Sequence, residues 1–344
     1  LELSFASGES SLSVRRFVAR ERICRLFEIE VWARSVRGDL DLSALAGDAA
    51  TFAIGGGFAL ASHSGARRWS GVCHVAELVQ GEATGLSTYY FRIAPTLWLL
   101  TQRTDYRVFQ RATIPEIVDS ILAEWSITAS WTIERSRYPK LDYRVQYDES
   151  DYAFVSRLLE EAGITCAFPD SAGGGAVHFA DAPGSVEPIR GAPFAFSDNV
   201  IQAEGRPFLS KVQLRHTLRP GAVALRDHDF RNPSFDLKAG ATSANALEAR
   251  LERFHYRPGS FLQVTGATSE VAAQNVSTPT ADDKGAVRHE GEYGARLAGS
   301  ALASLRADRR SVKYATNVIE LSPGAVFALD GHPWQIDMHM YFFA

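Results

Sequence analysis

Short runs in which apolar and polar residues alternate follow one another through the first hundred residues, and this pattern constrains the fold more than any other feature of the chain. Successive side chains of a strand point to opposite faces of a sheet, so such runs predict half-buried strands. Gly-rich connections separate them, as is typical of an antiparallel barrel or sandwich. We expect a first β-barrel domain over residues 1–103, built from LSVRRFVARE, LFEIEVWAR, ATFAI, FALASH, RWSGVCHVAELV and TYYFRIAP.

The period of the pattern changes in the next segment, FQRATIPEIVDSILAEWSI. Thr113 followed three residues later by Glu116 is a capping-box sequence, and Pro115 lies within the first turn. Apolar residues then recur at the spacing of one helix face. The sequence predicts a helix here and an α/β domain over residues 104–205, which ends in a strand hairpin with its turn at residues 173–175.

A second helix is predicted within YDESDYAFVSRLLEEAGI, the stretch that begins at residue 147. A serine is suited to its N-cap and a glycine to its C-terminal end, and an apolar stripe runs between them. We expect this to be the structural helix of the α/β domain. The residues that define its cap, apolar stripe and end are Ser150, Val155, Leu158, Leu159, Ala162 and Gly163.

Strand-like patterns return after residue 206 and predict a second β-barrel domain over residues 206–344, with an insertion at about residues 221–290. The end of this insertion, around residues 267–290, is polar and is predicted to be a long loop. A helix is then expected in GEYGARLAGSALASLRADRR, with its inward side chains at Leu297, Ala298, Ala301, Leu302 and Leu305. The chain starts without Met and stops directly after the strand-like WQIDMHMYFF, so we expect it to be cut from a longer protein.

Composition narrows the classes of function. The net charge is -4 and no basic block occurs, which argues against nucleic-acid binding. The longest apolar runs fall far short of the ~20 residues that span a bilayer, and no signal region opens the chain, so we expect no stable membrane insertion and a cytoplasmic protein. Its three cysteines are odd in number and widely spaced, and we expect reduced, buried side chains at Cys24, Cys73 and Cys166.

The predicted second helix carries five carboxylates, which could be an acid/base cluster or only a well-formed helix: Asp148, Glu149, Asp151, Glu160 and Glu161. The first three lie before or at the helix N-terminus, where unpaired N–H groups and the helix dipole stabilise negative charge. The last two lie roughly ten residues further on at ~1.5 Å each, too far to form a pair with the first three. Arg157 is spaced to be their partner. We interpret the segment as a capped, solvated helix.

Other candidate motifs are weak. RDHDF places His228 between Asp227 and Asp229, but in a strand the two carboxylates would face away from the imidazole. The glycines of AIGGGFAL lack the remaining residues of a dinucleotide or P-loop motif and predict a hairpin turn. No nucleophile elbow, zinc-protease motif or catalytic thiol signature occurs. We expect no catalytic residue, no cofactor and no metal site.

Several segments occur together in an order that resembles a known family. They are FQRATIPEIVDSILAEW, YPKLDYRVQYDESDYAFVSRLLEEAGI with the following hairpin, RDHDFRNP, FHYRPGSF, GARLAGSALASLRA and LSPGAVFALDGHP. The chain is similar to the VgrG spike proteins of type VI secretion systems and, more distantly, to the central hubs of contractile phage tails. Residues 143–164 are the most specific part of the resemblance, and FHYRPGSF departs from the family's usual Tyr-Pro-Gly.

The resemblance implies an α+β, β-rich fold with two related antiparallel β-barrels, an α/β domain and insertions. It further implies a homotrimer. With two barrels in each chain, the trimer would carry six barrels, which match the end of a hexameric inner tube of Hcp-like subunits. Expected partners are baseplate proteins, a C-terminal needle or PAAR-like tip and secreted effectors. The hub would assemble in the bacterial cytoplasm at the tube tip and leave the cell on contraction.

Two other functions remain open from the residues. An enzymatic effector domain that hydrolyses the cell envelope would need two carboxylates, or a nucleophile and a base, converging in a cleft. A carbohydrate-binding module would use exposed aromatic side chains, but the tryptophans are scattered along the chain and favour core packing: Trp32, Trp69, Trp98, Trp125, Trp131 and Trp334.

Overall fold

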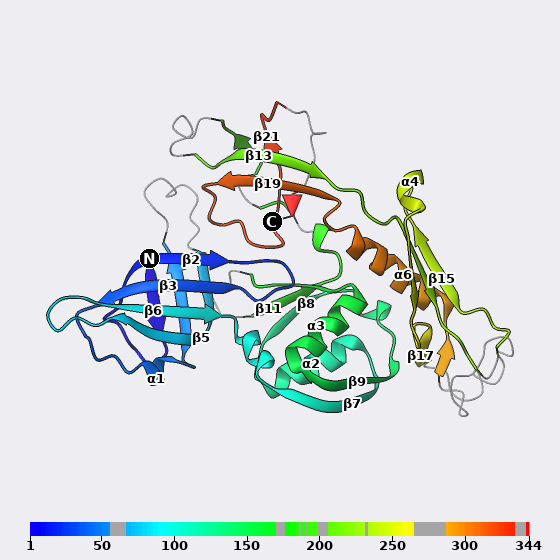
Figure 1. Cartoon of the computed structure of the whole chain (residues 1–344), viewed down its shortest axis with the longest axis horizontal. Coiled ribbons are helices and arrows are strands. Elements are labelled where there is room, and N and C mark those ends of the chain that lie inside the picture. Colours follow the sequence, from blue (N-terminus) through cyan, green and yellow to red (C-terminus); the bar gives the residue numbers. More distant parts are fainter. Residues whose placement is uncertain are drawn as a thin grey trace.

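The structure is a computed structural model that describes residues 1–55, 67–169, 176–185, 187–189, 192–198, 206–230, 233–264, 287–333 and 342–343. Figure 1 shows four neighbouring parts: a curled sheet near the N-terminus, a helical part beside it, a narrow sheet with a long helix, and a mixed sheet that contains β13 and β19. The described helices include none that is long and apolar enough to cross a bilayer.

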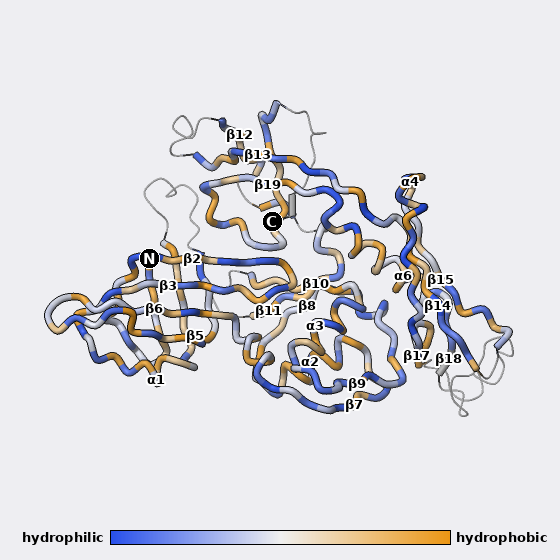
Figure 2. Tube along the Cα trace, viewed as in Figure 1, coloured by the Kyte–Doolittle hydropathy of each residue, from blue (hydrophilic) through white to orange (hydrophobic). Residues whose placement is uncertain are grey.

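The first part is a six-stranded antiparallel sheet in the order β1-β4-β5-β6-β3-β2. Its two edge strands, β1 and β2, contact each other, so the sheet curls around its own core. Hydrophobic and hydrophilic residues alternate along these strands, and the inward side chains include Ile29, Val31, Phe52 and Phe91 (Figure 2). The elements are β1 (Glu2–Phe5), β2 (Ser13–Arg20), β3 (Glu28–Ser35), α1 (Leu42–Leu45), β4 (Ala49–Ile54), β5 (Arg67–Gln80) and β6 (Ser87–Ala94).

The second part consists of two helices between a long ribbon and a small sheet. Strands β7 and β9 form the antiparallel ribbon, while β10, β11 and β8 form the sheet, in which β11 runs parallel to β8. The elements are η1 (Thr96–Thr101), β7 (Thr104–Ala112), α2 (Ile114–Glu124), β8 (Ala129–Thr132), η2 (Arg135–Arg137), β9 (Leu141–Ser150), α3 (Asp151–Ala162), β10 (Thr165–Ala167), β11 (Val177–Ala180) and η3 (Pro183–Ser185).

Both helices of this part begin with side-chain caps. The hydroxyl of Thr113 accepts from the Glu116 N–H at 3.2 Å and the Glu116 carboxylate accepts from the Thr113 N–H at 2.8 Å, so the predicted capping box of α2 is confirmed. At α3, Ser150 Oγ accepts from the Ala153 N–H at 3.1 Å. Gly163 ends that helix at φ +70°, a left-handed conformation that favours glycine.

The third part is a narrow sheet, β15-β14-β16, covered on one face by the long helix α6. Leu297, Ala298 and Leu302 of this helix are buried, while Ala301 and Leu305 are half-buried, which confirms the predicted inner face. The elements are β14 (Ala222–Arg226), β15 (Lys238–Thr242), α4 (Ala246–Ala249), β16 (Glu252–Tyr256), β17 (Leu262–Val264), β18 (Val287–His289) and α6 (Gly291–Leu305).

One hydrophobic core joins the second and third parts. Val223 and Leu225 of β14 and Leu297 of α6 belong to the same buried cluster as Val118 of α2 and Leu158 of α3. The segment predicted as an insertion therefore packs against the helices of the predicted α/β domain. The three domain boundaries stay a prediction.

The fourth part is a mixed sheet in the order β19-β13-β12-β21. Strand β12 runs parallel to both of its neighbours, whereas β13 and β19 are antiparallel. Its core contains only Phe194, Leu209, Val318 and Phe327 in the described part of the chain. The elements are β12 (Phe194–Phe196), β13 (Phe208–His216), β19 (Arg310–Thr316), β20 (Val326–Phe327), β21 (Leu329–Asp330) and β22 (Phe342–Phe343).

Several sequence-based expectations lie wholly or mainly outside the described residues. They are the glycine run after residue 55, the turn at residues 173–175, most of the loop around residues 267–290 and the segment 334–341. Among the cysteines, Cys73 and Cys166 are buried as expected, but Cys24 is exposed. The expectation was wrong for Cys24 because it lies in the connection between β2 and β3 rather than within a strand.

Candidate assembly surface and the network beneath it

The carboxylates of the most family-specific segment have three different environments. Asp148 and Glu149 lie in strand β9, not in a loop before the helix, and Asp151 is the first residue of α3. The predicted position of these acids before or at the helix N-terminus is therefore confirmed, but they do not share one role, because Glu149 binds Arg157 whereas Asp151 is buried among other side chains.

Asp151 is fully buried and accepts hydrogen bonds from four side chains. Arg103 and Arg107 of the neighbouring chain segment form ion pairs with its two oxygens. Gln146 Nε2 donates to Oδ1 at 2.9 Å and Trp125 Nε1 donates to Oδ2 at 3.0 Å. The carboxylate therefore joins the β7–β9 ribbon to the helices that the ribbon covers.

The electrostatics of Asp151 suit a structural role. Burial by itself raises the pKa of this carboxyl, but the hydrogen bonds from Gln146 and Trp125 and the two arginines outweigh burial and lower the pKa below its usual range. A general acid needs the opposite shift, toward neutrality. Asp151 is held as a permanent anion and not as a proton donor.

The two glutamates near the C-terminus of α3 also differ from the sequence-based interpretation. Arg157 was expected to pair with them, but its guanidinium binds Glu149 of strand β9. Glu161 is only 8% exposed and binds Arg144 at 2.7 Å and Arg257 at 2.8 Å. Arg157 has the helical spacing needed to pair with Glu160 and Glu161. In the folded chain, however, residues of β9 and of the segment after β16 are the partners of Arg157 and Glu161 instead. Glu160 is exposed, as expected.

The outer face of the β7–β9 ribbon is apolar. Tyr106 is 62% exposed and Tyr147 is 73% exposed, and the two lie opposite each other with ring centroids 5.1 Å apart. Val108 and Tyr143 continue the same exposed face. We call these four residues the ribbon face; Figure 1 shows that β7 and β9 lie at the margin of the molecule.

The inner face of the same ribbon is polar. Arg107, Arg144 and Gln146 point toward the helices, alongside Phe109, whose ring lies 5.6 Å from that of Phe154. An antiparallel ribbon on the surface of a monomer normally has the reverse arrangement, with apolar residues inside and polar residues outside. Exposed aromatic side chains gathered on one flat ribbon are typical of a surface that another protein covers.

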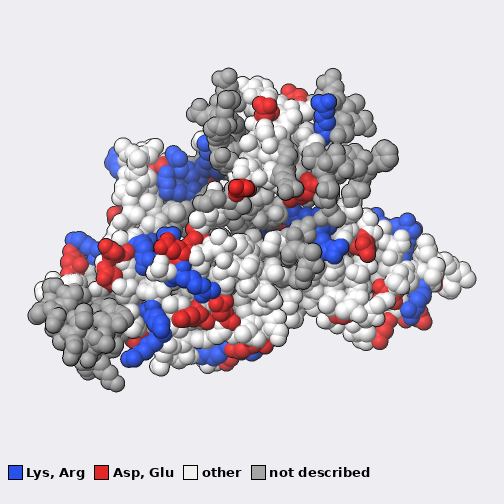
Figure 3. All heavy atoms as spheres, turned by 180° about the vertical axis from the view of Figure 1, so that it is seen from behind, with Lys and Arg blue, Asp and Glu red and all other residues white. Residues whose placement is uncertain are grey.

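Two further exposed aromatic side chains lie on the sheet that contains β14, among charged residues that include Arg226 and Lys238. Val223 and Leu225 face α6 and are buried, so the residues between them face outward. Phe254 lies opposite Ala224 and is 59% exposed, and Tyr256 follows two residues later at 58%. We call Phe254 and Tyr256 the sheet face. Acidic and basic side chains elsewhere lie interspersed, as the view from behind shows (Figure 3).

The RDHDF segment shows the alternation that its sequence predicts. Asp227 and Asp229 are buried and His228 is exposed. The Asp227 carboxylate accepts from the N–H groups of His228 and Gly259, and Asp229 Oδ2 lies 3.4 Å from His289 Nε2. Within the described ranges, no three His, Cys, Asp or Glu side chains come close enough together to hold a metal ion.

The five tryptophans in the described part of the chain lie in separate elements. Trp69 is buried in β5, while the indole N–H of Trp125 is bound to Asp151 and that of Trp131 to Asp119. They form no aromatic platform of the kind that a carbohydrate-binding module uses.

Comparison with known proteins agrees with this arrangement. The family of the phage tail baseplate hub (GPD) matches residues 20–342, nearly the whole chain. The chain therefore belongs to the phage tail baseplate hub family.

Individual relatives define the class of protein more closely. The type VI secretion system spike protein VgrG4b of Pseudomonas aeruginosa is 35% identical over 269 residues, which make up 76% of this chain and 31% of that protein. The resemblance to type VI spike proteins is confirmed. The chain spans about a third of the length of the curated type VI spike proteins that it matches.

Solved structures show the same fold at low sequence identity. The 43 kDa tail protein of prophage MuSo2 from Shewanella oneidensis matches with a TM-score of 0.57 and 11% identity, over 95% of this chain and 87% of that protein. The Escherichia coli c3393 protein, a type VI secretion component with structural similarity to the phage T4 tail proteins gp27 and gp5, matches with a TM-score of 0.51 and 22% identity, over 63% of this chain and 56% of its own. The predicted β-rich, tail-hub-like fold is confirmed.

Proposed function

We propose that this chain is a non-enzymatic structural hub of a contractile injection machine of the type VI secretion kind. In this proposal it forms a homotrimer that caps the hexameric inner tube and carries the puncturing tip and effectors. The observation that carries the proposal is the ribbon face, an exposed aromatic surface on a chain of the tail hub family. Such a surface needs a protein partner, whereas the buried carboxylate below it is neutralised by arginines and offers no chemistry.

The chain also has the two separate surfaces that a ring requires. In a cyclic trimer each protomer uses one patch to bind the next protomer and a different patch to bind the previous one. The ribbon face and the sheet face each carry exposed aromatic side chains and lie on different parts of the molecule (Figure 1). We propose that the ribbon face of one protomer packs on the sheet face of its neighbour.

The proposed injection machine also implies partners outside the trimer. A trimer whose protomers each contribute two β-domains, the curled first sheet and the mixed sheet, would offer six β-surfaces to a hexameric tube of Hcp-like subunits. Baseplate proteins would surround it, and a needle or PAAR-like tip with effectors would extend it. It would assemble in the bacterial cytoplasm and be ejected to the exterior or into a target cell when the sheath contracts.

Sedimentation velocity at micromolar concentration tests the trimer. The expected result is a species of three times the chain mass, and a stable monomer would contradict the proposal. Tyr106→Lys with Tyr147→Lys, and separately Phe254→Lys with Tyr256→Lys, should each abolish the trimer. Val36→Lys is the matched control, because Val36 is 77% exposed and lies outside both faces.

Mixing the two double variants tests which surfaces meet. Each variant keeps one intact face, so the mixture should form one-to-one pairs through the single complementary contact that remains. If each variant instead assembles normally, or if the mixture stays monomeric while wild type is trimeric, the proposed pairing of the two faces is wrong.

A further inference from the structure

Two cysteines meet where the first sheet contacts the α/β part. Cys24 lies between β2 and β3, and Cys166 lies in β10, 142 residues further along the chain. The Cys24 N–H donates to the Cys166 carbonyl at 2.8 Å, and the Cys166 N–H donates to Cys24 Sγ at 3.4 Å. The two residues are therefore fixed side by side by contacts in both directions.

The contact between the two side chains fits a disulfide. The Cys24 sulfur lies 3.4 Å from the backbone nitrogen of Cys166, and the two thiols are within hydrogen-bond reach of each other. A disulfide joins cysteines whose Cα atoms are roughly 4.4–6.8 Å apart, so two thiols in such contact are candidates for closure. Cys24 also adopts φ +57°, an unusual conformation for a residue with a side chain, which the contacts with Cys166 maintain.

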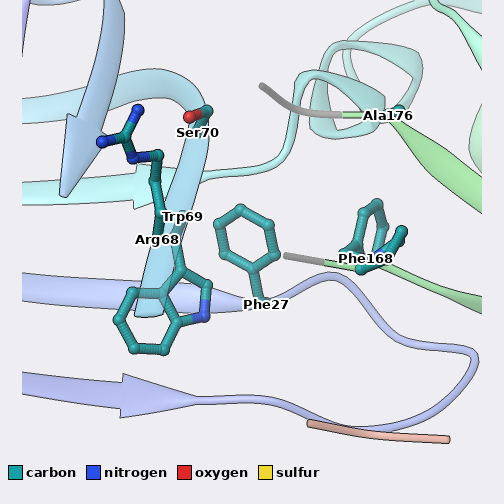
Figure 4. Close-up of a pocket in the computed structure, with 7 residues that line it drawn as sticks. Phe27, Arg68, Trp69, Ser70, Phe168 and Ala176 are labelled. Carbon is teal, nitrogen blue, oxygen red and sulfur yellow. The ribbon is translucent and has the colours of Figure 1, made fainter. Parts of the chain in front are cut away.

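The surroundings hold the two segments together. Phe27 and Phe168, close in sequence to the two cysteines, make an edge-to-face contact with ring centroids 5.4 Å apart. Figure 4 shows Phe27 between Trp69 of the first sheet and Phe168 at a small cavity. The thiols thus lie in a packed contact and not in a loosely held loop.

The two thiols differ in the way that a reactive pair does. A hydrogen bond from Cys166 to Cys24 favours the Cys24 thiolate and outweighs burial, so the pKa of Cys24 is lowered to about 6. The same hydrogen bond raises the pKa of Cys166. Cys24 is exposed and Cys166 is buried, so one sulfur is an accessible nucleophile and the other is a protected second thiol.

We propose that Cys24 and Cys166 form a redox-active dithiol that closes to an intramolecular disulfide upon reaction with a small-molecule disulfide such as oxidised glutathione. The Cys24 thiolate attacks one sulfur of oxidised glutathione, forms a mixed disulfide and releases one glutathione thiolate. Cys166 then loses its proton to solvent, and its sulfur attacks Cys24 Sγ and displaces the second glutathione. Two protein thiols are oxidised and one glutathione disulfide is reduced to two thiols.

The product would link the first sheet to the α/β part covalently. Since the bridge closes a loop of more than a hundred residues, it restricts the unfolded chain strongly, and we expect the thermal midpoint to rise by about 5 °C. This inference does not depend on the proposed hub function, because it concerns the folded chain alone.

Glutathione redox buffers test the proposal on the full chain. The expected product is 2 Da lighter than the reduced protein and yields a Cys24–Cys166 linked peptide in non-reducing mass spectrometry. Cys73 should remain reduced, because burial raises its pKa to about 11 and its thiol donates to the Val75 carbonyl. Cys73→Ser should form the same bridge as wild type.

Two variants separate the steps. Cys166→Ser should stop at the mixed disulfide, while Cys24→Ser should leave Cys166 unmodified. Iodoacetamide labelling of wild type should reach half its maximal rate near pH 6, and Cys166→Ala should shift that midpoint upward because it removes the thiol that donates to the Cys24 thiolate. A stable mixed disulfide in wild type, a bridge between two molecules, or no oxidation over the range of buffers would overturn the proposal.

Discussion

The two faces of the β7–β9 ribbon carry opposite kinds of side chain. The inner face holds Arg107 and Gln146 against the buried carboxylate of Asp151, and the outer face presents Tyr106 and Tyr147 to solvent. The same alternation produces both faces. The inner face finds all of its partners within one chain, whereas the outer face is the surface for which we propose a protein partner.

The largest effect is expected where the helix meets the core behind the inner face. Leu158 is fully buried, so Leu158→Asp places a charge where no partner is available and should destabilise the chain by more than about 4 kcal/mol. Val155→Asp should act in the same way. Loss of the cooperative unfolding transition in circular dichroism would show this, while a folded Leu158→Asp protein would refute it.

Next in size is the loss of the buried charge itself. Asp151→Asn removes the buried anion that Arg103 and Arg107 share and leaves them only the more exposed Glu124 in common, and breaking a buried ion pair from one side costs about 3 kcal/mol. Urea denaturation measures the change. Asp119→Asn is the control, because its carboxylate lies near the surface and binds Trp131 and Arg135; equal losses in the two variants would contradict the special role of Asp151.

The pH dependence of stability should report the same carboxylate. The pKa of Asp151 is lower in the folded than in the unfolded chain, so the unfolded chain takes up the proton first as the pH falls. The stabilisation by Asp151 is complete above about pH 4 and is lost below it. Unfolding free energies from pH 5 to pH 2 should therefore fall more steeply for wild type than for Asp151→Asn, and parallel curves would argue against the assignment.

A smaller effect separates two neighbouring residues of β9. Gln146→Ala removes three hydrogen bonds from a buried site and should cost about 1–3 kcal/mol. Tyr147→Ala changes an exposed side chain and should alter stability by no more than about 0.5 kcal/mol at concentrations where the chain is monomeric. The order of the two values in urea denaturation is the test, and a larger loss at Tyr147 would reverse the assignment of the two faces.

The smallest effect is expected at the exposed end of α3. Glu160 is exposed, so Glu160→Gln should leave both the unfolding free energy and the sedimentation profile unchanged. Glu161→Gln is the matched comparison, because it weakens two ion pairs of a largely buried carboxylate and should be measurably destabilising.

Local signals in the sequence were sufficient to predict the helices but not the partners of their charged side chains. Thr113 with Glu116 fixes the start of α2 because the caps need only neighbours in sequence. The partners of Asp151, Arg157 and Glu161 come from residues up to 96 positions away, which no helix rule can supply. Phe154, fully buried and stacked near Phe109, was left out of the predicted stripe although it lies four residues before Leu158, on the same face of the helix.

The exposed ribbon face was not predicted, for a different reason. Tyr143, Val145 and Tyr147 alternate with charged and polar residues, so the period of β9 is visible in the sequence. Alternation defines two faces but does not say which one faces inward, and the usual rule would place the aromatic side chains inside. The buried Asp151 decides the matter, since its arginine partners must lie on the same side of the ribbon as the helix.

Glu161 has a mechanical consequence. Its carboxylate binds Arg144 in the ribbon and Arg257 immediately after β16, so a single side chain at the end of α3 connects the strands that bear the ribbon face and the sheet face. A force applied to the ribbon would pass through these two ion pairs to the sheet that contains β16. If the chain is the hub that we propose, this connection would help the protomer to move as one rigid body when the machine contracts.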